Sequence, residues 1–155
     1  MKKINYLILL VVVFIAISCE PKYEKQYSWA YPIAGDWSVH SYNNDGSIKG
    51  GPYEIKSYNS SFGQDSIWFD DYATKSTDGH FWSMKYKVSA NMNSKTFETK
   101  GSTNAISGYN ISIIVNEGKI IDNDSIYFKI IFSDDPESTY ILAGHRANKY
   151  DDYMQ

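Results

Sequence analysis

Short segments of strictly alternating apolar and polar residues constrain the fold of this chain more than any other feature. In the two clearest segments, residues 80–89 and 125–132, apolar side chains occupy every second position. These positions are Trp82, Met84, Tyr86 and Val88 in the first segment and Ile126, Phe128, Ile130 and Phe132 in the second. A period of two places one face of a β-strand in a core and the other in water. No helical spacing of three and four is sustained after the N-terminal segment, so the sequence predicts half-buried antiparallel strands and little helix.

Further strands, and the turns between them, follow from the same reasoning. The alternation predicts strands at residues 36–42, 109–115 and 140–146 and, more weakly, at residues 52–58, 66–72, 95–100 and 119–122. Turn-forming sequences separate these segments: NNDG at 43–46, TDG at 77–79, NMNS at 91–94 and NEG at 116–118. Eight or nine short strands joined by tight turns predict an all-β fold, either an up-and-down barrel or a sandwich.

The N-terminal segment predicts export and attachment to a membrane. Two lysines precede an apolar run from Leu7 to Ile17, which is shorter than the roughly 20 residues that a membrane-spanning helix needs. The run ends in AISC, and Cys19 is the only cysteine of the chain. This arrangement resembles the bacterial lipobox, in which the cysteine becomes the lipid-bearing N-terminus. A stray cysteine in a signal peptide is the competing interpretation.

These features divide the chain into three parts. We expect a signal peptide at residues 1–18, a lipidated cysteine and polar tether at residues 19–31, and a β-barrel domain at residues 32–155. A chain of this kind is expected on the bacterial cell envelope. We favour the outer membrane and leave open whether the domain faces the periplasm or the outside.

The charge and the polar residues argue against several functions. The net charge of −3 becomes more negative once the signal lysines are removed, so nucleic acid is not an expected partner. The histidines, His40, His80 and His145, have no second ligand at metal-binding spacing, and we predict neither a metal nor a cofactor. Aspartate pairs such as Asp70 and Asp71 are interpreted as solvated edge residues. No nucleophile elbow is present, so no catalytic residue is assigned.

One end of a closed barrel can be predicted from residues near the two ends of the domain. Closure makes the first and last strands neighbours. Trp37 could then plug the barrel after a tight backbone approach at Gly35, while Gly144 and Arg146 lie on the last strand. Arg146 is the only arginine in the chain, and a planar guanidinium stacks on an indole better than an ammonium does. We therefore expect Arg146 to pack over Trp37.

A family resemblance agrees with this interpretation. GDW near the first strand and an arginine near the last are similar to the calycin and lipocalin signature. The lipobox together with WAYPIAGDWSV and YILAGHRANKY resembles a family of bacterial lipoproteins known as lipid-binding putative hydrolases. The resemblance implies a single calycin-like barrel of about eight antiparallel strands, with Gly35, Trp37, Gly144, His145 and Arg146 at recurring positions. The ANKY that follows GHR departs from the threonine and glycine common in such matches.

The aromatic residues suggest what the barrel binds. Aromatic side chains make up 16% of the chain, and tyrosine accounts for 14 residues. We predict a membrane-anchored, non-enzymatic barrel that binds a small apolar or lipid-like ligand. Its cavity lining is predicted as Val39, Tyr53, Trp82, Met84, Tyr86, Phe128 and Ile130. A barrel packed solid by these side chains is an equally valid expectation.

Two other functions stay open. An accessory envelope lipoprotein would contact proteins or glycans through surface aromatics such as Trp68 and Tyr72. A hydrolase with an unrecognised site is implied only by the name of the family.

Overall fold

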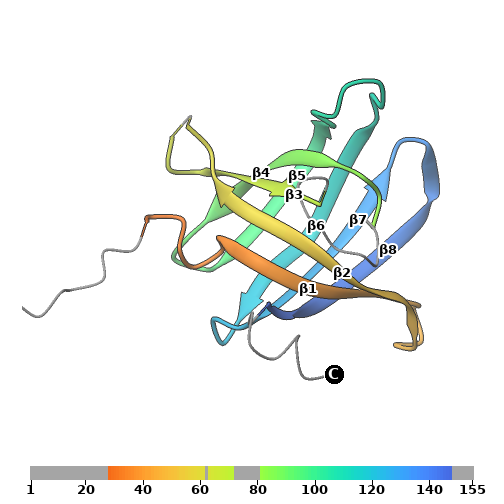
Figure 1. Cartoon of the computed structure of the whole chain (residues 1–155), viewed down its shortest axis with the longest axis horizontal. Helices are drawn as coiled ribbons and strands as arrows, with labels where there is room; N and C mark the ends of the chain where they lie inside the picture. Colours follow the sequence, from red (N-terminus) through yellow and green to blue (C-terminus); the bar gives the residue numbers. More distant parts are fainter. Residues whose placement is uncertain (1–27, 62, 72–80, 148–155) are drawn as a thin grey trace, which may run out of the picture.

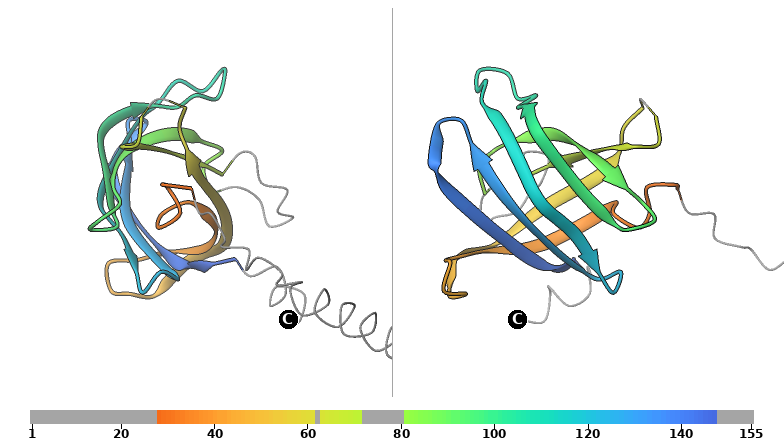
Figure 2. Two further views of the ribbon diagram at one scale, coloured as in Figure 1. Left: turned by 90° about the vertical axis from the view of Figure 1, so that its left-hand side faces the viewer. Right: turned by 180° about the vertical axis from the view of Figure 1, so that it is seen from behind.

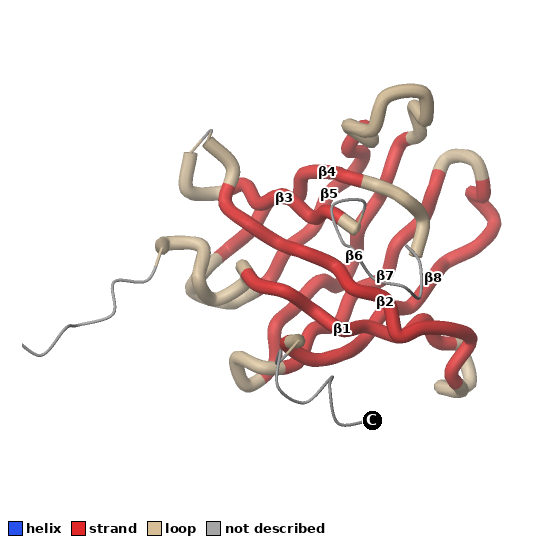
Figure 3. Tube along the Cα trace, in the orientation of Figure 1, coloured by secondary structure: helices blue, strands red, loops and turns tan. Residues whose placement is uncertain are grey.

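The chain folds into a closed barrel of eight antiparallel strands, which confirms the predicted all-β class. The computed structural model describes residues 28–61, 63–71 and 81–147. The strands are β1 (Gly35–Tyr42), β2 (Ile48–Asn59), β3 (Ser66–Asp70), β4 (Lys85–Asn91), β5 (Thr96–Thr103), β6 (Ser112–Ile121), β7 (Ser125–Phe132) and β8 (Asp135–Arg146). No helix occurs in these described ranges (Figures 1 and 3).

The first and last strands close the barrel. Each strand pairs with its neighbour in sequence, and β1 pairs with β8 from Trp37 opposite Arg146 to Tyr42 opposite Ile141. Closure removes the exposed edges at which an open sheet would aggregate. It also brings the two segments that carry the GDW and GHR sequences side by side.

The two ends of the barrel differ in what covers them. At one end, here called the closed end, the turn of residues 28–34 precedes β1 and lies within the outline of the barrel (Figure 2, left). The opposite end, here called the mouth, carries the β1–β2, β5–β6 and β7–β8 connections, the end of β3 and the start of β4. Residues 28–34 belong to the packed structure, because Ala30 and Ile33 are fully buried.

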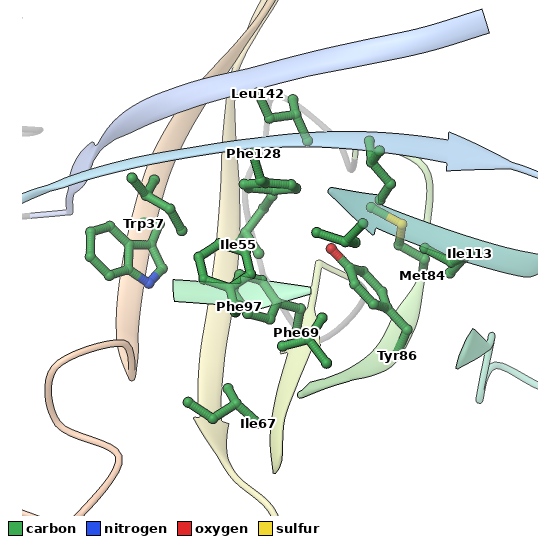
Figure 4. Packing of buried hydrophobic residues seen from close by; sticks show 14 of the residues in the cluster. Trp37, Ile55, Ile67, Phe69, Met84, Tyr86, Phe97, Ile113, Phe128 and Leu142 are labelled. Carbon is green, nitrogen blue, oxygen red and sulfur yellow. The ribbon is translucent and has the colours of Figure 1, made fainter. Parts of the chain in front are cut away.

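A single apolar core fills the barrel between these ends (Figure 4). Inward-facing side chains alternate along β1 and β7, and in β7 buried residues occupy each second position. Three phenylalanines from different strands meet near the middle. Phe69 lies with its ring centroid 4.9 Å from that of Phe97 and 5.8 Å from that of Phe128.

Two local predictions are wrong. The NEG sequence at residues 116–118 was expected to form a turn between two strands, but β6 runs through it with a β-bulge. Glu117 takes a positive φ of 55° there, so the extra residue is accommodated without ending the strand. The strand expected at residues 80–89 begins only at Lys85, after a bend in which Ser83 has φ 54°.

The turns predicted at residues 43–46 and 91–94 are confirmed. The TDG sequence at 77–79 lies outside the described residues. The part of the chain that the structure describes has no helix long and apolar enough to cross a membrane.

Candidate functional site

The closed end is sealed by Trp37 and Arg146. The guanidinium carbon of Arg146 lies 4.3 Å from the centroid of the Trp37 ring. Its Nη1 donates to the carbonyl oxygen of Ala34 at 2.8 Å, and its Nε donates to that of Asn123 at 2.7 Å. Arg146 therefore joins the turn before β1 to the β6–β7 hairpin while it covers the indole.

Two glycines leave room for this arrangement. A Cβ at Gly35 would collide with Nη1 of Arg146, so the space of a side chain is filled by the guanidinium. A Cβ at Gly144 would collide with the carbonyl oxygen of Ser38, where β1 and β8 approach each other. Substituting either glycine would separate segments that the closed end holds together.

The buried hydroxyl of Ser57, which the sequence did not reveal, also belongs to the closed end and pairs with Trp37. Trp37 Nε1 donates a hydrogen bond of 2.8 Å to Ser57 Oγ, and that hydroxyl donates to the carbonyl oxygen of Ile33 at 2.7 Å. The serine faces inward at an alternating position of β2, which the pattern at 52–58 could have revealed. The indole is thus fully buried with its one polar atom satisfied.

The mouth is built differently, from a group of aromatic rings that we call the mouth cluster. Its members come from the β2, β7 and β8 strands and from the residues just before β4: Tyr53, Phe81, Trp82, Phe132 and Tyr140. Trp82 stacks on Phe132 with centroids 4.4 Å apart and contacts Tyr140 at 5.1 Å. Phe81 contacts Tyr53 at 5.2 Å. Only Phe132 of the five is fully buried, so the cluster presents apolar surface at the entrance of the barrel.

Asp71 positions the residues that bring Trp82 into this cluster. Its carboxylate accepts hydrogen bonds from the backbone N–H groups of Trp82 at 2.9 Å and Met84 at 2.5 Å. Asp70 and Asp71 are 3% and 1% exposed, so their interpretation as solvated edge residues is wrong. Asp70 lies beneath Tyr58, which donates to it at 2.8 Å. Asp71 accepts hydrogen bonds from backbone N–H groups at the bend before β4, which explains why the strand begins later than predicted.

Hydroxyl groups tie the mouth cluster to two further aspartates. Trp82 Nε1 donates to the Tyr109 hydroxyl at 2.6 Å, and Tyr109 donates to Asp134 at 2.5 Å. Tyr140 donates to Asp135 at 2.5 Å. Burial, followed by the hydrogen bond to Asp134, raises the pKa of Tyr109, and the hydrogen bond to Asp135 raises the pKa of Tyr140. Both tyrosines are therefore neutral donors at physiological pH.

The seven residues predicted to line a cavity fall into two groups. Tyr53 and Trp82 are partly buried members of the mouth cluster. The other five lie deeper and are at most 1% exposed: Val39, Met84, Tyr86, Phe128 and Ile130. These five contact other core side chains in this structure, and their role as a ligand lining stays a prediction.

The hydroxyl of Tyr86 is a polar atom within the deeper group. The Tyr86 hydroxyl is buried and has no hydrogen-bond partner among the described residues. Burial and, secondarily, the negative charge of Asp71 raise the pKa of Tyr86 well above its ordinary value. The hydroxyl is therefore protonated and available as a donor.

A surface groove of about 680 Å³ lies away from the mouth cluster. It borders the β4–β5 hairpin and the bulge of β6 and is lined in part by Ala90 and Phe97. Three carboxylates, those of Asp65, Glu98 and Glu117, also border it. The groove therefore combines apolar and charged side chains, as the mouth does with Asp134 and Asp135.

A half-buried aromatic on the outer wall, Trp68, has lysines around it. Trp68 faces outward from β3, and the ammonium groups of Lys85 and Lys87 lie 5.2 Å and 4.7 Å from its ring centroid. Lys85 also approaches Asp70 at 3.5 Å. Tyr72, the other surface aromatic considered for partner contact, lies outside the described residues.

The described residues contain no group of three or more histidine, cysteine, aspartate or glutamate side chains that could hold a metal ion. His40 lies edge-on to Tyr42, and His145 is exposed. Cys19 and His80 fall outside the described ranges.

The geometry defines a small antiparallel β-barrel that is sealed at one end and has an aromatic entrance at the other. A family model described as lipid-binding putative hydrolase matches residues 22–151, nearly the whole chain. The chain therefore belongs to this family, which confirms the family resemblance of its GDW and GHR segments; the lipobox at residues 16–19 lies outside the matched range. No curated protein matches the chain.

Proposed function

We propose that this protein is a membrane-anchored lipoprotein of the bacterial envelope, positioned in the outer membrane, and that it binds a small apolar or lipid-like ligand without catalysing a reaction. The observation that carries the proposal is the mouth cluster, a set of half-buried rings above an apolar core. Membership of a lipid-binding family supports the class of ligand.

The chemistry of the mouth suits an apolar part of a ligand. The rings of Phe81, Trp82 and Tyr140 offer apolar surface, and burying such surface contributes about 25 cal/mol per Å². Hydroxyl groups are present at the rim, but Tyr109 and Tyr140 are already joined to Asp134 and Asp135. A ligand therefore gains mainly from apolar contact at this depth.

The anchor is proposed from Cys19 and the apolar run before it. A chain held by more than one acyl group would stay at the membrane, because each buried CH₂ group contributes roughly 0.8 kcal/mol. Labelling cells with a radioactive fatty acid tests this part: wild type should incorporate label and Cys19→Ser should not. Label in both proteins, or in neither, would contradict lipidation at Cys19.

Ligand binding is tested on the full chain purified in amphipol, which keeps an anchored protein in solution without free detergent. Native mass spectrometry should detect a retained apolar molecule, and N-phenylnaphthylamine should fluoresce when it is added. Trp82→Ala should weaken binding of this probe, whereas Trp68→Ala, the same change on the outer wall, should not. Equal binding by both variants would contradict a site at the mouth.

A second candidate function rests on Trp68 and its lysines. An indole beside Lys85 and Lys87 is suited to contact with an acidic glycan or protein of the envelope. Capture of such a partner from cross-linked cells should then be lost in Trp68→Ala and retained in Trp82→Ala, the reverse of the result for ligand binding.

A further inference from the structure

The buried hydroxyl of Tyr86 is the starting point. Its side chain is 1% exposed, its ring stacks on Phe69 at 5.9 Å, and its hydroxyl projects among the buried residues (Figure 4). No described residue pairs with that hydroxyl. Buried polar atoms in native proteins nearly always have a partner, so an orphan calls for an explanation. Trp37, a polar side chain buried at the closed end, has its partner in Ser57.

Tyr86, which carries this unpartnered hydroxyl, lies close in sequence to the mouth cluster. Tyr86 lies on β4, two residues beyond Met84 and four beyond Trp82 of the mouth cluster. Among the buried residues of β4, Tyr86 is therefore the one nearest in sequence to the mouth cluster.

We propose that Tyr86 is a specificity-determining residue, whose hydroxyl donates a hydrogen bond to a neutral acceptor, such as an ester carbonyl, on a lipid that enters through the mouth. The polar group of the lipid then lies deep in the barrel, and its hydrocarbon part contacts the mouth cluster. This inference rests on the proposed function, because it names the chemical class of the ligand for the same site.

The charge near Tyr86 decides between a neutral and an anionic acceptor. Asp71 is buried, and its negative charge contributes to raising the pKa of Tyr86. The same charge would oppose a carboxylate placed at the hydroxyl, since two like charges in a poorly solvated site repel each other. An ester or amide carbonyl accepts the hydrogen bond without that repulsion.

The test compares three ligands of equal chain length: octane, methyl octanoate and octanoate. Each competes with N-phenylnaphthylamine for the full chain in amphipol. Wild type is expected to bind methyl octanoate about tenfold more tightly than octane, the affinity ratio that one hydrogen bond to a buried donor supplies. Octanoate should bind no better than octane.

The matched variants are Tyr86→Phe and Tyr127→Phe. Tyr127 loses the same hydroxyl from the outer side of β7, beneath Lys119. Tyr86→Phe should bind octane as wild type does and lose the tenfold preference for the ester, whereas Tyr127→Phe should keep it. Thermal unfolding of both variants confirms that they fold.

The outcomes separate this inference from the proposed function. If octane and the ester bind wild type equally, or the preference survives in Tyr86→Phe, Tyr86 does not select the ligand although the barrel binds apolar molecules. If octanoate binds most tightly, the acceptor is anionic and the proposal is wrong. If neither the probe nor any of the three ligands binds, the proposed function itself fails.

Discussion

The two ends of this barrel carry similar residue types but differ in how deeply these side chains are buried and in how their polar atoms are hydrogen-bonded. At the closed end, an indole and a guanidinium are fixed by hydrogen bonds to three different segments, and Trp37 is fully buried with its polar atom paired. At the mouth, the Trp82 indole is only partly buried and bonds to a tyrosine hydroxyl. Below it, the Tyr86 hydroxyl has no partner among the described residues.

This difference separates residues that stabilise the barrel from residues that are available to bind a ligand. Side chains at the closed end have their polar groups satisfied within the protein, so a ligand could only disturb them. The mouth combines accessible apolar surface with an unused donor beneath it, which is the composition of a binding pocket. The predictions below test the contrast, beginning with the largest expected effect.

Trp37→Ala is expected to lower the free energy of unfolding by about 3–5 kcal/mol, because it empties the fully buried plug of the closed end. Urea unfolding followed by circular dichroism measures the change. Trp82→Ala is the matched change at the mouth and should cost much less, since that ring is only partly buried. Equal losses would show that the two ends contribute alike to stability.

Arg146→Ala is expected to lower the free energy of unfolding by about 1–3 kcal/mol through lost stacking on Trp37 and lost donors to the carbonyls of Ala34 and Asn123. Arg146→Lys should recover only part of this loss, because an ammonium cannot stack while donating in a fork. An unfolding midpoint identical to wild type in Arg146→Ala would mean that the contact does not contribute to stability.

Tyr86→Phe is expected to raise the free energy of unfolding by about 1 kcal/mol at neutral pH, because it removes a buried hydroxyl that has no partner in the described ranges. Tyr127→Phe, on the outer side of β7, should be close to neutral. A clear destabilisation by Tyr86→Phe would indicate that the hydroxyl has a partner in solution, such as a bound water.

The alkaline stability of Tyr86→Phe should change in a defined direction. Burial, and then the charge of Asp71, raise the pKa of Tyr86 in the folded protein. Below a pH of about 10 both states keep the proton, whereas above it the unfolded chain loses the proton first and stability falls. Wild type should therefore lose up to about 1.4 kcal/mol more per pH unit above 10 than Tyr86→Phe does. Parallel pH profiles would contradict the raised pKa.

Part of the candidate site could be predicted from the sequence. The composition identified Arg146 as exceptional, and closure of a meander placed it near Trp37, where the structure has it 4.3 Å from the ring. The alternation in residues 80–89 indicated that Trp82 and Tyr86 share a side. It did not reveal that one lies at the surface of the mouth and the other deep inside, because depth depends on neighbouring strands.

The sequence by itself determined most of the strands, the turns at residues 43–46 and 91–94, and the family. A period of two is a local property, and a strand with one buried face satisfies it wherever the strand lies. The two end segments are likewise readable without coordinates, and they indicated the family that the comparison confirms.

Only the tertiary structure decided what the polar residues do. Asp71 is buried because the bend before β4 brings the N–H groups of Trp82 and Met84 to its carboxylate. Residues 116–118 continue a strand instead of turning because β5 and β7 pair with β6 on both sides of the bulge. The Tyr86 ring stacks on Phe69 of β3, and its hydroxyl has no partner in the described part of the chain. Hydrogen bonding and burial depend on such distant partners, which an alternating pattern does not specify.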